Sequence, residues 1–500
     1  MNAITALPAL AVELDGTLLS AAEMATLESV VVRQQLSTPT ACELTFLYTA
    51  GAQPLADLAL GTPLRVQAGP DAAELFRGEV TAVEARFQPP ATCQVIVRAY
   101  DLLHRLRKRQ PVRLHSEVTL VDLAREMTSD LGIGVSGPER GPLWRRIIQY
   151  RNSDFDFLTS LAARYGLFLF LDDGVLTLGG LKTGGSAIEL RLGEQLLEAR
   201  LERNGATSWR SMTVLGWDPT LIEFQEAAAT EATVERAGGV AAGSSGERTL
   251  ANQTAPDATH LTSMAQAELD DGAAAEVVFS GEAEGSPELK PGRTVRAIGL
   301  GGPGDGVFML GSVRHQISRE RGFVSQISSE LPRRPHPRPD FFVAPAIVKR
   351  IDDPEKLGRV SVSLPTLAGL ETDWMCVLAA GSGPAKGLIA LPEVDDRVMV
   401  LVSAENPATG LVLGSATGSR GLPDTGIENG TVVRFALRSP GGQRIELDDA
   451  KKCLRLTVAG GSYLELGPEL LTLHSATGVL IDASGKSLAI QADKIDLRRG

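Results

Sequence analysis

Apolar and polar residues alternate along several short segments in the first hundred positions of the chain. An alternation with a period of two is typical of a strand that buries one face, because successive side chains point to opposite sides. Turn residues such as Gly61, Pro63 and Pro89 separate the segments, so a small β-barrel or sandwich is expected here. The predicted strands cover residues 30–32, 42–47, 64–66, 78–83 and 93–100.

Two segments with helical spacing interrupt this pattern. Thr119 can cap the first helix, whose apolar residues recur at helical spacing until Gly132. Ser153 can cap the second, which ends at Gly166, a residue that readily adopts the left-handed conformation of a helix stop. The expected helices cover residues 119–131 and 153–165, and strand patterns follow at 167–171 and 175–178.

A glycine-rich segment at residues 299–306 contains the pattern G-x-G-x-x-G. A dinucleotide site needs a helix that opens at these glycines, so that its first amides face the pyrophosphate. Here Pro303 and the apolar stretch after it indicate a hairpin loop between strands at 295–298 and 307–310. Residues 238–247 are small and polar, which predicts a surface loop.

Prolines recur at close spacing within residues 331–340. Proline fixes the backbone and donates no hydrogen bond, so this segment is expected to be a stiff linker at a domain boundary. Beyond it, short apolar segments match the strand inventory of an OB barrel. They cover residues 346–349, 359–364, 374–378, 397–402 and 411–413.

After Pro440 the chain changes into short alternating strands that repeat every eight to ten residues or so. Each strand offers two or three apolar side chains, worth roughly 1.5 to 3 kcal/mol apiece when fully buried. Ordering the backbone costs roughly 1 to 2 kcal/mol per residue. A single ribbon is therefore marginal, and we expect three copies to wind round one axis and share a core. A sandwich within one chain is the alternative.

The repeat strands are predicted at residues 444–447, 454–458, 464–466, 471–473, 479–481, 488–490 and 495–497. The alternate Arg, Glu, Thr and Asp residues would then face outward. The predicted needle core consists of Ile445, Leu447, Leu454, Leu456, Leu464, Leu466, Leu471, Leu473, Ile481, Leu488, Ile490, Ile495 and Leu497.

The composition agrees with a β-rich protein. The 500 residues include 52 Gly and 28 Pro while aromatic residues make up only 5%, a balance that suits many short strands joined by tight turns. A net charge of -12 argues against a general polyanion binder, which needs a basic surface. The basic runs at 104–109 and 333–338 are therefore interpreted as a solvated face and an exposed linker.

The cysteines lie far apart and form no C-x-x-C pair, which fits a reducing cytoplasm. The N-terminal residues lack the basic start and apolar core of a signal peptide, and no apolar run approaches the roughly 20 residues of a membrane span. We therefore expect a protein that is made in the cytoplasm and leaves its cell only within an assembly. The cysteines are Cys42, Cys93, Cys376 and Cys453.

No residue pattern points to catalysis. Adjacent acids such as Asp352 and Asp353 would point to opposite faces of a strand, and the same holds for the pairs at 395–396 and 448–449. The 6 histidines show no metal-ligand spacing, and no G-x-S-x-G nucleophile motif occurs. We predict no catalytic residue, no metal and no cofactor. An OB barrel that binds single-stranded nucleic acid would need stacked aromatics, and Trp374 stands nearly alone.

Several longer stretches are informative because of their order. They are residues 152–158 with Leu161 and Gly166, residues 310–315, residues 358–360, 391–398 and 411–415, and residues 440–447. In this order they resemble the hub helix, the closing hub strand, the OB signature and the start of the needle in the VgrG/phage-baseplate spike family. The resemblance covers nearly the whole chain.

The resemblance implies a mainly β architecture. The chain would begin with a hub of two β-barrel-like domains with inserted helices, continue with an OB-fold barrel, and end in a C-terminal trimeric β-helix needle. The implied boundaries are residues 1–331 for the hub, 332–340 for the linker, 341–420 for the OB domain and 432–500 for the needle.

The family also implies a structural homotrimer without enzymatic activity. Its hub would dock on a hexameric inner tube and adapt sixfold to threefold symmetry among other baseplate subunits, while its needle punctures a target membrane transiently. The tail lacks the His-x-His metal site that closes some phage spikes, so a separate PAAR-type tip protein is expected on Ile495, Asp496, Leu497 and Arg498.

The chain has no room between Ser419 and Val432 for the lysozyme-like domain of some phage spikes, and no effector domain follows Gly500. This compactness favours an extracellular or cytoplasmic injection particle or a phage tail over a longer type VI protein. A nucleic-acid-binding OB protein and a spike-borne hydrolase are the alternatives.

Overall fold

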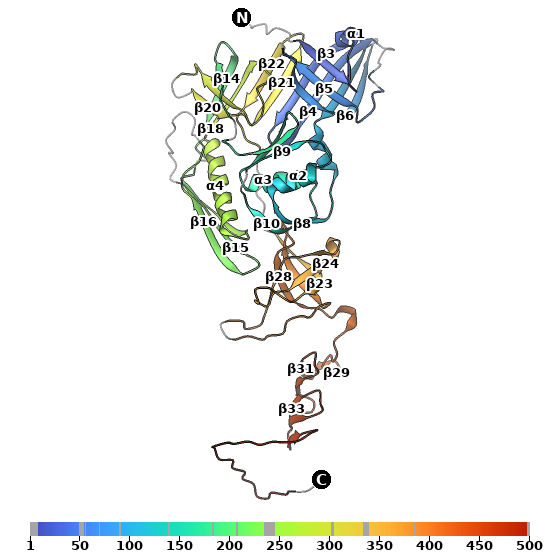
Figure 1. The fold of residues 1–500 in the computed structure, drawn as a ribbon, viewed down its shortest axis with the longest axis vertical. Coiled ribbons are helices and arrows are strands. Elements are labelled where there is room, and N and C mark those ends of the chain that lie inside the picture. Colours follow the sequence, from blue (N-terminus) through green and yellow to red (C-terminus); the bar gives the residue numbers. More distant parts are fainter. Residues whose placement is uncertain are drawn as a thin grey trace. The chain divides into compact units, whose positions relative to one another are not determined.

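The computed structural model describes residues 9–497 except 50–54, 56, 70, 90–91, 139–140, 183–184, 207–208, 235–245, 302–304, 334–339 and 384–385. It divides into two compact units, Met1–Ala416 and Thr417–Gly500. Figure 1 labels the helices and strands of both. Strands predominate in each, so the mainly β class is confirmed.

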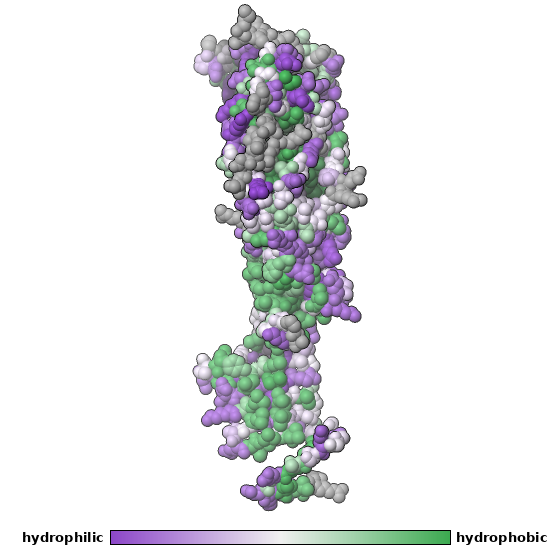
Figure 2. Space-filling view, turned by 90° about the vertical axis from the view of Figure 1, so that its left-hand side faces the viewer, coloured by the Kyte–Doolittle hydropathy of each residue, from purple (hydrophilic) through white to green (hydrophobic). Residues whose placement is uncertain are grey.

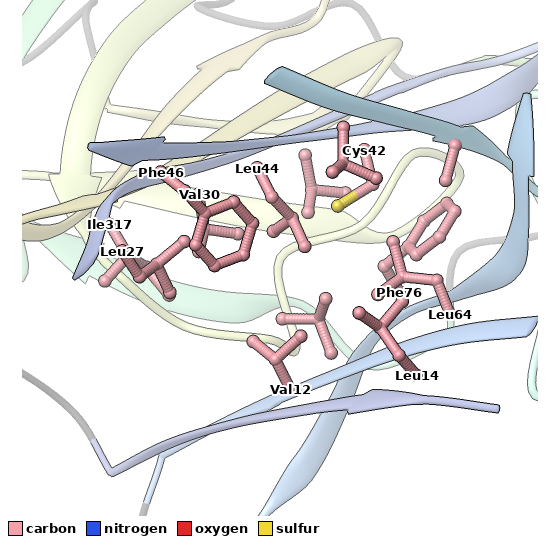
Figure 3. Packing of buried hydrophobic residues seen from close by; sticks show 14 of the residues in the cluster. Val12, Leu14, Leu27, Val30, Cys42, Leu44, Phe46, Leu64, Phe76 and Ile317 are labelled. Carbon is pink, nitrogen blue, oxygen red and sulfur yellow. The ribbon is translucent and has the colours of Figure 1, made fainter. Parts of the chain in front are cut away.

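The first body of the N-terminal unit encloses one hydrophobic core. Alternate side chains of β4, such as Cys42, Leu44 and Phe46, point into this core and are at most 1% exposed (Figure 3). This is the consequence that a two-residue period predicts for a half-buried strand. The body comprises β1 (Leu10–Leu14), β2 (Thr17–Leu18), α1 (Ala21–Thr26), β3 (Leu27–Gln35), β4 (Thr38–Thr49), β5 (Pro63–Ala68), β6 (Ala73–Gln88) and β7 (Thr92–Tyr100).

The same sheet continues into a second body with its own core. β21 pairs with β3 from Ser312 opposite Gln35 to Ser318 opposite Ser29, which joins both bodies in one 11-stranded sheet of order β14-β18-β22-β21-β3-β4-β7-β6-β5-β1-β2. The second core includes Phe279, stacked on Phe308 with 5.0 Å between ring centroids. Its strands are β13 (Ile188–Arg191), β14 (Leu196–Arg203), β18 (Val277–Glu284), β19 (Thr294–Ile298), β20 (Gly306–Met309), β21 (Ser312–Ser318) and β22 (Gly322–Ser328).

The glycine-rich segment connects two paired strands. β19 and β20 are antiparallel, with Thr294 opposite Met309 and Ala297 opposite Gly306. The hairpin interpretation is therefore confirmed, and no helix opens at these glycines within the described residues 294–301 and 305–309. Most of the predicted loop at 238–247 lies outside the described residues, and Glu247 already begins a strand.

A third body contains the two helices at the capping signatures. The Thr119 side chain accepts a hydrogen bond from the Asp122 N–H, and Ser153 accepts one from the Asp156 N–H. Both helices pack in one core with the flanking strands. The body comprises η1 (Leu102–Lys108), β8 (Arg113–Thr119), α2 (Leu120–Thr128), β9 (Gly134–Ser136), β10 (Leu143–Gln149), α3 (Asp154–Arg164), β11 (Phe168–Asp172) and β12 (Val175–Gly179).

The basic run at 104–109 is largely the solvated face that the sequence suggested, since Arg105, Arg107 and Lys108 are exposed. The run forms most of the short helix η1, whose other side buries Leu103, His104 and Leu106. Arg105 also pairs with Glu79 on β6 through its Nε, 3.1 Å from the Glu79 Oε2, which ties this helix to the first body.

A long helix that the sequence analysis did not predict covers a three-stranded sheet. α4 (Ala258–Ala274) packs Leu261, Met264 and Ala265 onto β15 (Ser211–Asp218), β16 (Glu223–Ala229) and β17 (Glu247–Thr254). Asp257 caps the helix by accepting hydrogen bonds from the N–H groups of Thr259 and His260. None of the helices in the described part of the chain is both long and apolar enough to span a membrane.

The remainder of the N-terminal unit is a small barrel-like sheet of order β25-β24-β23-β27-β28-β26. Val348, Val362 and Val400 lie in its core and are 0% exposed. Its elements are β23 (Phe341–Arg350), β24 (Ser361–Leu364), η4 (Pro365–Leu367), β25 (Leu370–Glu371), β26 (Cys376–Val377), β27 (Arg397–Ser403) and β28 (Gly410–Ser415), close to the predicted OB strands. Most of the predicted linker, residues 334–339, lies outside the described residues.

The C-terminal unit contains a five-stranded antiparallel meander of order β31-β32-β33-β34-β35. Between His474 and residue 497 the chain forms no strand, although strands were predicted at 479–481, 488–490 and 495–497. A strand needs a neighbour for its N–H and C=O groups, and one chain supplies none there. The unit comprises η5 (Gly418–Arg420), β29 (Ile427–Glu428), β30 (Thr431–Val432), β31 (Arg434–Arg438), β32 (Arg444–Asp448), β33 (Cys453–Thr457), β34 (Tyr463–Leu466) and β35 (Leu471–His474).

His315 on β21 is a fully buried titratable residue of the 11-stranded sheet. The ring lies between the Ser325 Oγ, 2.8 Å from Nδ1, and the Leu289 carbonyl, 3.1 Å from Nε2. Burial lowers its pKa to about 4, so the unfolded chain binds a proton more readily than the folded one. We therefore expect the body around this sheet to lose ~2 kcal/mol of stability through His315 as the pH falls from 7 to 5.

Urea unfolding of the parent chain and of His315→Gln at both pH values checks this expectation. The variant should lose less stability on acidification than the parent. Asp101, whose pKa burial raises to about 6, acts in the opposite direction in both proteins, so the difference between them isolates His315. Equal losses in the two proteins would show that His315 is not the responsible group.

Candidate assembly surfaces

The strands β31–β35 gather their large aliphatic side chains, together with one phenylalanine, on a single face. The pairing registers align these residues in two rows that cross all five strands. One row is Phe435, Leu447, Leu454, Leu466 and Leu471, and the other is Leu437, Ile445, Leu456, Leu464 and Leu473. We refer to these ten residues as the apolar face.

The apolar face is open to solvent in the single chain. Phe435 is 60% exposed, Leu471 61% and Leu473 59%, and Figure 2 shows hydrophobic side chains gathered on this unit. Contiguous apolar surface of this kind on a soluble protein marks an interaction site, because covering it removes it from water. The apolar face is therefore a candidate assembly surface.

The structure brings eight predicted needle-core residues together on the apolar face: Ile445, Leu447, Leu454, Leu456, Leu464, Leu466, Leu471 and Leu473. It does not bring the other five, Ile481, Leu488, Ile490, Ile495 and Leu497, into any strand, and all five are exposed. Of the predicted tip-binding end, Ile495, Asp496 and Leu497 have no regular structure, and Arg498 lies outside the described residues.

Sequence reasoning missed two members of the apolar face. Phe435 and Leu437 lie on β31 and pair with Leu447 and Ile445. The signal was present, because Arg434, Phe435, Ala436, Leu437 and Arg438 alternate in the same way as the recognised repeats. The repeat thus begins one strand earlier than predicted, before Pro440.

The opposite side of the meander is polar. The Arg455 Nη1 lies 3.2 Å from the Glu465 Oε2, and the Arg455 guanidinium lies 4.0 Å from the centre of the Tyr463 ring. Tyr463 in turn stacks on His474 with 5.0 Å between ring centroids. Exposed pairs of this kind add little stability, so their main effect is to keep this side of the meander in water.

An ion-pair cluster lies just before the meander. The Asp424 carboxylate accepts from the Nε and Nη2 of Arg434 and from the Nη2 of Arg444, each at 3.2 Å. The hydrogen bond from Arg434 is the main reason that the pKa of Asp424 falls to about 2. The carboxylate therefore stays ionised at neutral pH and ties the segment before β29 to β31 and β32.

The OB barrel contains a buried ion pair. Arg359 donates from Nε to the Asp353 Oδ2 at 3.0 Å and from Nη2 to Oδ1 at 2.8 Å. Arg359 is 2% exposed and Asp353 7%, and the backbone N–H groups of Glu355 and Leu357 also donate to the same carboxylate. The hydrogen bonds from Arg359 hold the pKa of Asp353 well below its usual range.

Two protein families match this chain. The Alg8 N-terminal domain matches residues 12–319 and therefore more than half of the chain. The type VI secretion system/phage-baseplate injector OB domain matches residues 344–416. The chain belongs to the Alg8 N-terminal domain family and is a VgrG-like spike protein.

Solved structures with the same fold agree with this assignment. A chain of the half-lidded Francisella PdpA-VgrG complex is similar with a TM-score of 0.55 and 9% identity, over 95% of the spike protein and 89% of that chain. The 43 kDa tail protein of prophage MuSo2 from Shewanella oneidensis has a TM-score of 0.51 and 17% identity, over 64% and 97%.

A tail protein from Neisseria meningitidis MC58 has a TM-score of 0.50 and 17% identity, over 64% of the spike protein and 95% of that chain. At these identities the likeness is one of fold. No curated protein matches the spike protein significantly.

In two of the three candidate acid pairs of the spike protein, one acid is buried and its neighbour is exposed. Asp353 is committed to Arg359 while Asp352 is exposed, and Asp448 is buried while Asp449 is exposed. Within the described residues, no group of three or more His, Cys, Asp or Glu side chains is placed to hold a metal ion.

Trp374, the aromatic residue considered for base stacking, is only 9% exposed and lies 4.8 Å beneath the Arg350 guanidinium. A nucleic-acid base therefore has no open ring face to stack on at this position.

Proposed function

We propose that the spike protein works as a homotrimer whose C-terminal repeat forms a needle. The apolar face is the observation that supports this proposal. Its ten residues are on average about half exposed in one chain, so covering them is worth on the order of 10 kcal/mol per chain. Association costs an estimated 4 to 15 kcal/mol, so the exposed apolar residues of segment 475–497 are expected to contribute as well.

Three copies would both cover the apolar face and provide partner strands for the segments after His474. They would bury the apolar face against two identical faces, and they would supply neighbours for the segments at 479–481, 488–490 and 495–497, which lack a partner strand in one chain. The charged side, with Arg455 and Glu465, would stay in water. The proposed needle is thus a β-helix completed by its partners.

The proposed position of the trimer is the centre of a contractile injection system or phage-tail-like particle. Each chain contributes two sheet bodies with separate cores, so a trimer presents six, which suits docking on a hexameric inner tube. The needle would carry a PAAR-type tip protein on the end that includes Ile495 and Leu497, contact other baseplate subunits through the hub, and pierce a target membrane transiently. We favour a compact extracellular or cytoplasmic particle.

Native mass spectrometry tests the proposal directly. The purified full chain should appear at three times its monomer mass, because threefold association is what completes the repeat. Addition of the cognate PAAR-type protein should shift the trimer by the mass of one tip molecule. A chain that stays monomeric at micromolar concentration would refute the needle, and a trimer that ignores the tip protein would refute the proposed tip.

A further inference from the structure

The core of the OB barrel is not made by the barrel alone. Ile148 of hub strand β10 is 0% exposed and packs within the cluster of barrel residues that includes Val348 and Val400. Leu114 and Tyr150, also from the hub, pack partly buried against the same cluster. The Tyr150 hydroxyl adds a hydrogen bond to the Ala404 carbonyl, at 2.9 Å. The hub thus completes the barrel interior.

Asn406, between β27 and β28, joins the barrel to the edge of β10. Its Nδ2 donates to the Arg146 carbonyl at 2.9 Å, and its Oδ1 accepts from the Ile148 N–H at 3.2 Å. β10 pairs on its other side with β8 in a two-stranded sheet. The Asn406 amide therefore occupies the place of one peptide group of a third strand, satisfying both a donor and an acceptor of the strand edge.

Two arginines of the hub reach into the same interface. Arg164, the last residue of α3, pairs with Glu405 of the barrel, and its Nη2 donates to the Thr254 carbonyl at 2.8 Å. The two paired side chains are only 11% and 19% exposed. Arg146 donates from Nη1 to the barrel carbonyls of Glu371, at 3.1 Å, and Thr372, at 2.8 Å.

We infer that these contacts form a joint that holds the OB barrel to the hub in one fixed orientation, with Asn406 and Arg164 as its positioning residues. Hydrogen bonds from buried, directional groups are made in only one arrangement, whereas a purely apolar contact could slide. The covalent connection through residues 334–339 is then not what holds the two parts together. The inference does not require the proposed trimer.

The joint predicts that the two parts stay associated after the chain is cut between them. A specific protease site would replace residues 334–339 in the full-length protein, and the cut protein would be passed over a gel-filtration column at micromolar concentration. The hub fragment and the OB–needle fragment should co-elute in equal amounts. Separation of the fragments in the otherwise unaltered protein would overturn the inference, whatever the oligomeric state.

Asn406→Asp tests the positioning role with almost no change in size. A carboxylate oxygen would replace the Nδ2 donor and face the Arg146 carbonyl, so the fragments should bind each other at least about 30-fold more weakly. Asn429→Asp makes the same chemical change at an exposed position of the C-terminal unit and should leave their affinity unchanged. Equal affinities of the Asn406→Asp and unaltered fragments would remove Asn406 from the joint.

Hydrogen exchange in the uncut Asn406→Asp protein distinguishes a lost joint from a lost fold. Amides of β23 and β27 should remain protected while the cut fragments separate. If this variant does not fold, Arg146→Met probes the same interface from the hub, since it removes the bonds to the Glu371 and Thr372 carbonyls. Retention of full fragment affinity in Arg146→Met would then count against the joint.

Discussion

Replacing Leu456 with aspartate should leave the spike protein monomeric at concentrations at which the parent chain forms the proposed trimer. Leu456 lies in the middle of one row of the apolar face, between Ile445 and Leu464 on the neighbouring strands. In a trimer this change would place three carboxylates in a shared apolar core, and each unpaired buried charge costs several kcal/mol. The total, on the order of 10 kcal/mol, corresponds to a loss of many powers of ten in association.

The control for this experiment is the next residue along the same strand. Thr457 lies on the opposite, polar side and is paired with Arg444, so Thr457→Asp introduces the same charge next to a cation in water. Light scattering coupled to gel filtration should show a trimer for Thr457→Asp and a monomer for Leu456→Asp. A trimer of the Leu456 variant, or a monomer of both, would show that the apolar face is not the trimer contact.

The predictions that succeeded from sequence are those that depend on neighbours along the chain. β4 and β7 were predicted because alternate residues such as Leu44 and Phe46 face the core, and a period of two appears in the sequence itself. The helix starts at Thr119 and Ser153 were predicted because the capping residue and its partner lie three positions apart. Both signals are local, so no knowledge of the tertiary fold was needed.

α4 was missed because its pattern is weak. Its buried positions include Ala265, Ala267 and Ala273, and alanine gives little contrast between an apolar stripe and a polar face. The available signal was intrinsic propensity, since alanine is the strongest helix former, together with the Asp257 cap. Reading helices only from amphipathic spacing therefore hides a helix that packs closely on a sheet through small side chains.

The apolar face was predicted in part, because its residues alternate, but the strands expected beyond His474 do not form in the single chain. Leu488 and Ile490 alternate as Leu464 and Leu466 do, yet only the second pair forms a strand in the structure. The joint was not foreseen at all. Asn406 and Ile148 are far apart in sequence. Nothing in the residues around Asn406 indicates that its side-chain amide will bind the edge of the strand that contains Ile148.

The buried pair in the OB barrel shows the same limit for charged residues. The sequence pattern placed Asp352 and Asp353 on opposite faces of a strand and did not indicate that either acid pairs with Arg359. The turn that follows Asp353 directs its carboxylate inward to Arg359 and leaves Asp352 in solvent. Which of two adjacent acids is buried depends on the backbone of the turn, and this is a property of the folded structure.

Asp353→Asn should destabilise the OB barrel by about 1.5 to 3 kcal/mol, because it removes the buried counter-charge of Arg359 and leaves only the half-exposed Glu355 carboxylate, 3.0 Å from its Nη2. Asp352→Asn removes the same charge from an exposed neighbour and should change stability by less than about 0.5 kcal/mol. Hydrogen exchange of the β24 and β27 amides at pH 7 measures the effect on the barrel itself. Equal protection in the two variants would contradict a stabilising role of the pair.

The pH dependence of this difference identifies its origin. Because Arg359 lowers the pKa of Asp353 in the folded barrel, the stabilisation is complete above the unfolded pKa of about 3.9 and is lost as the pH falls through the lower, folded value. The gap in stability between the parent and Asp353→Asn should therefore be constant from pH 8 to 5 and narrow under stronger acid. If the difference in stability does not narrow in acid, the asparagine acts through packing rather than through charge.

The double variant Asp353→Asn with Arg359→Met separates these two causes. If the poorly paired Arg359 charge is the cause, the double variant should recover part of the lost stability, since methionine needs no partner. If packing is the cause, adding Arg359→Met should not restore stability.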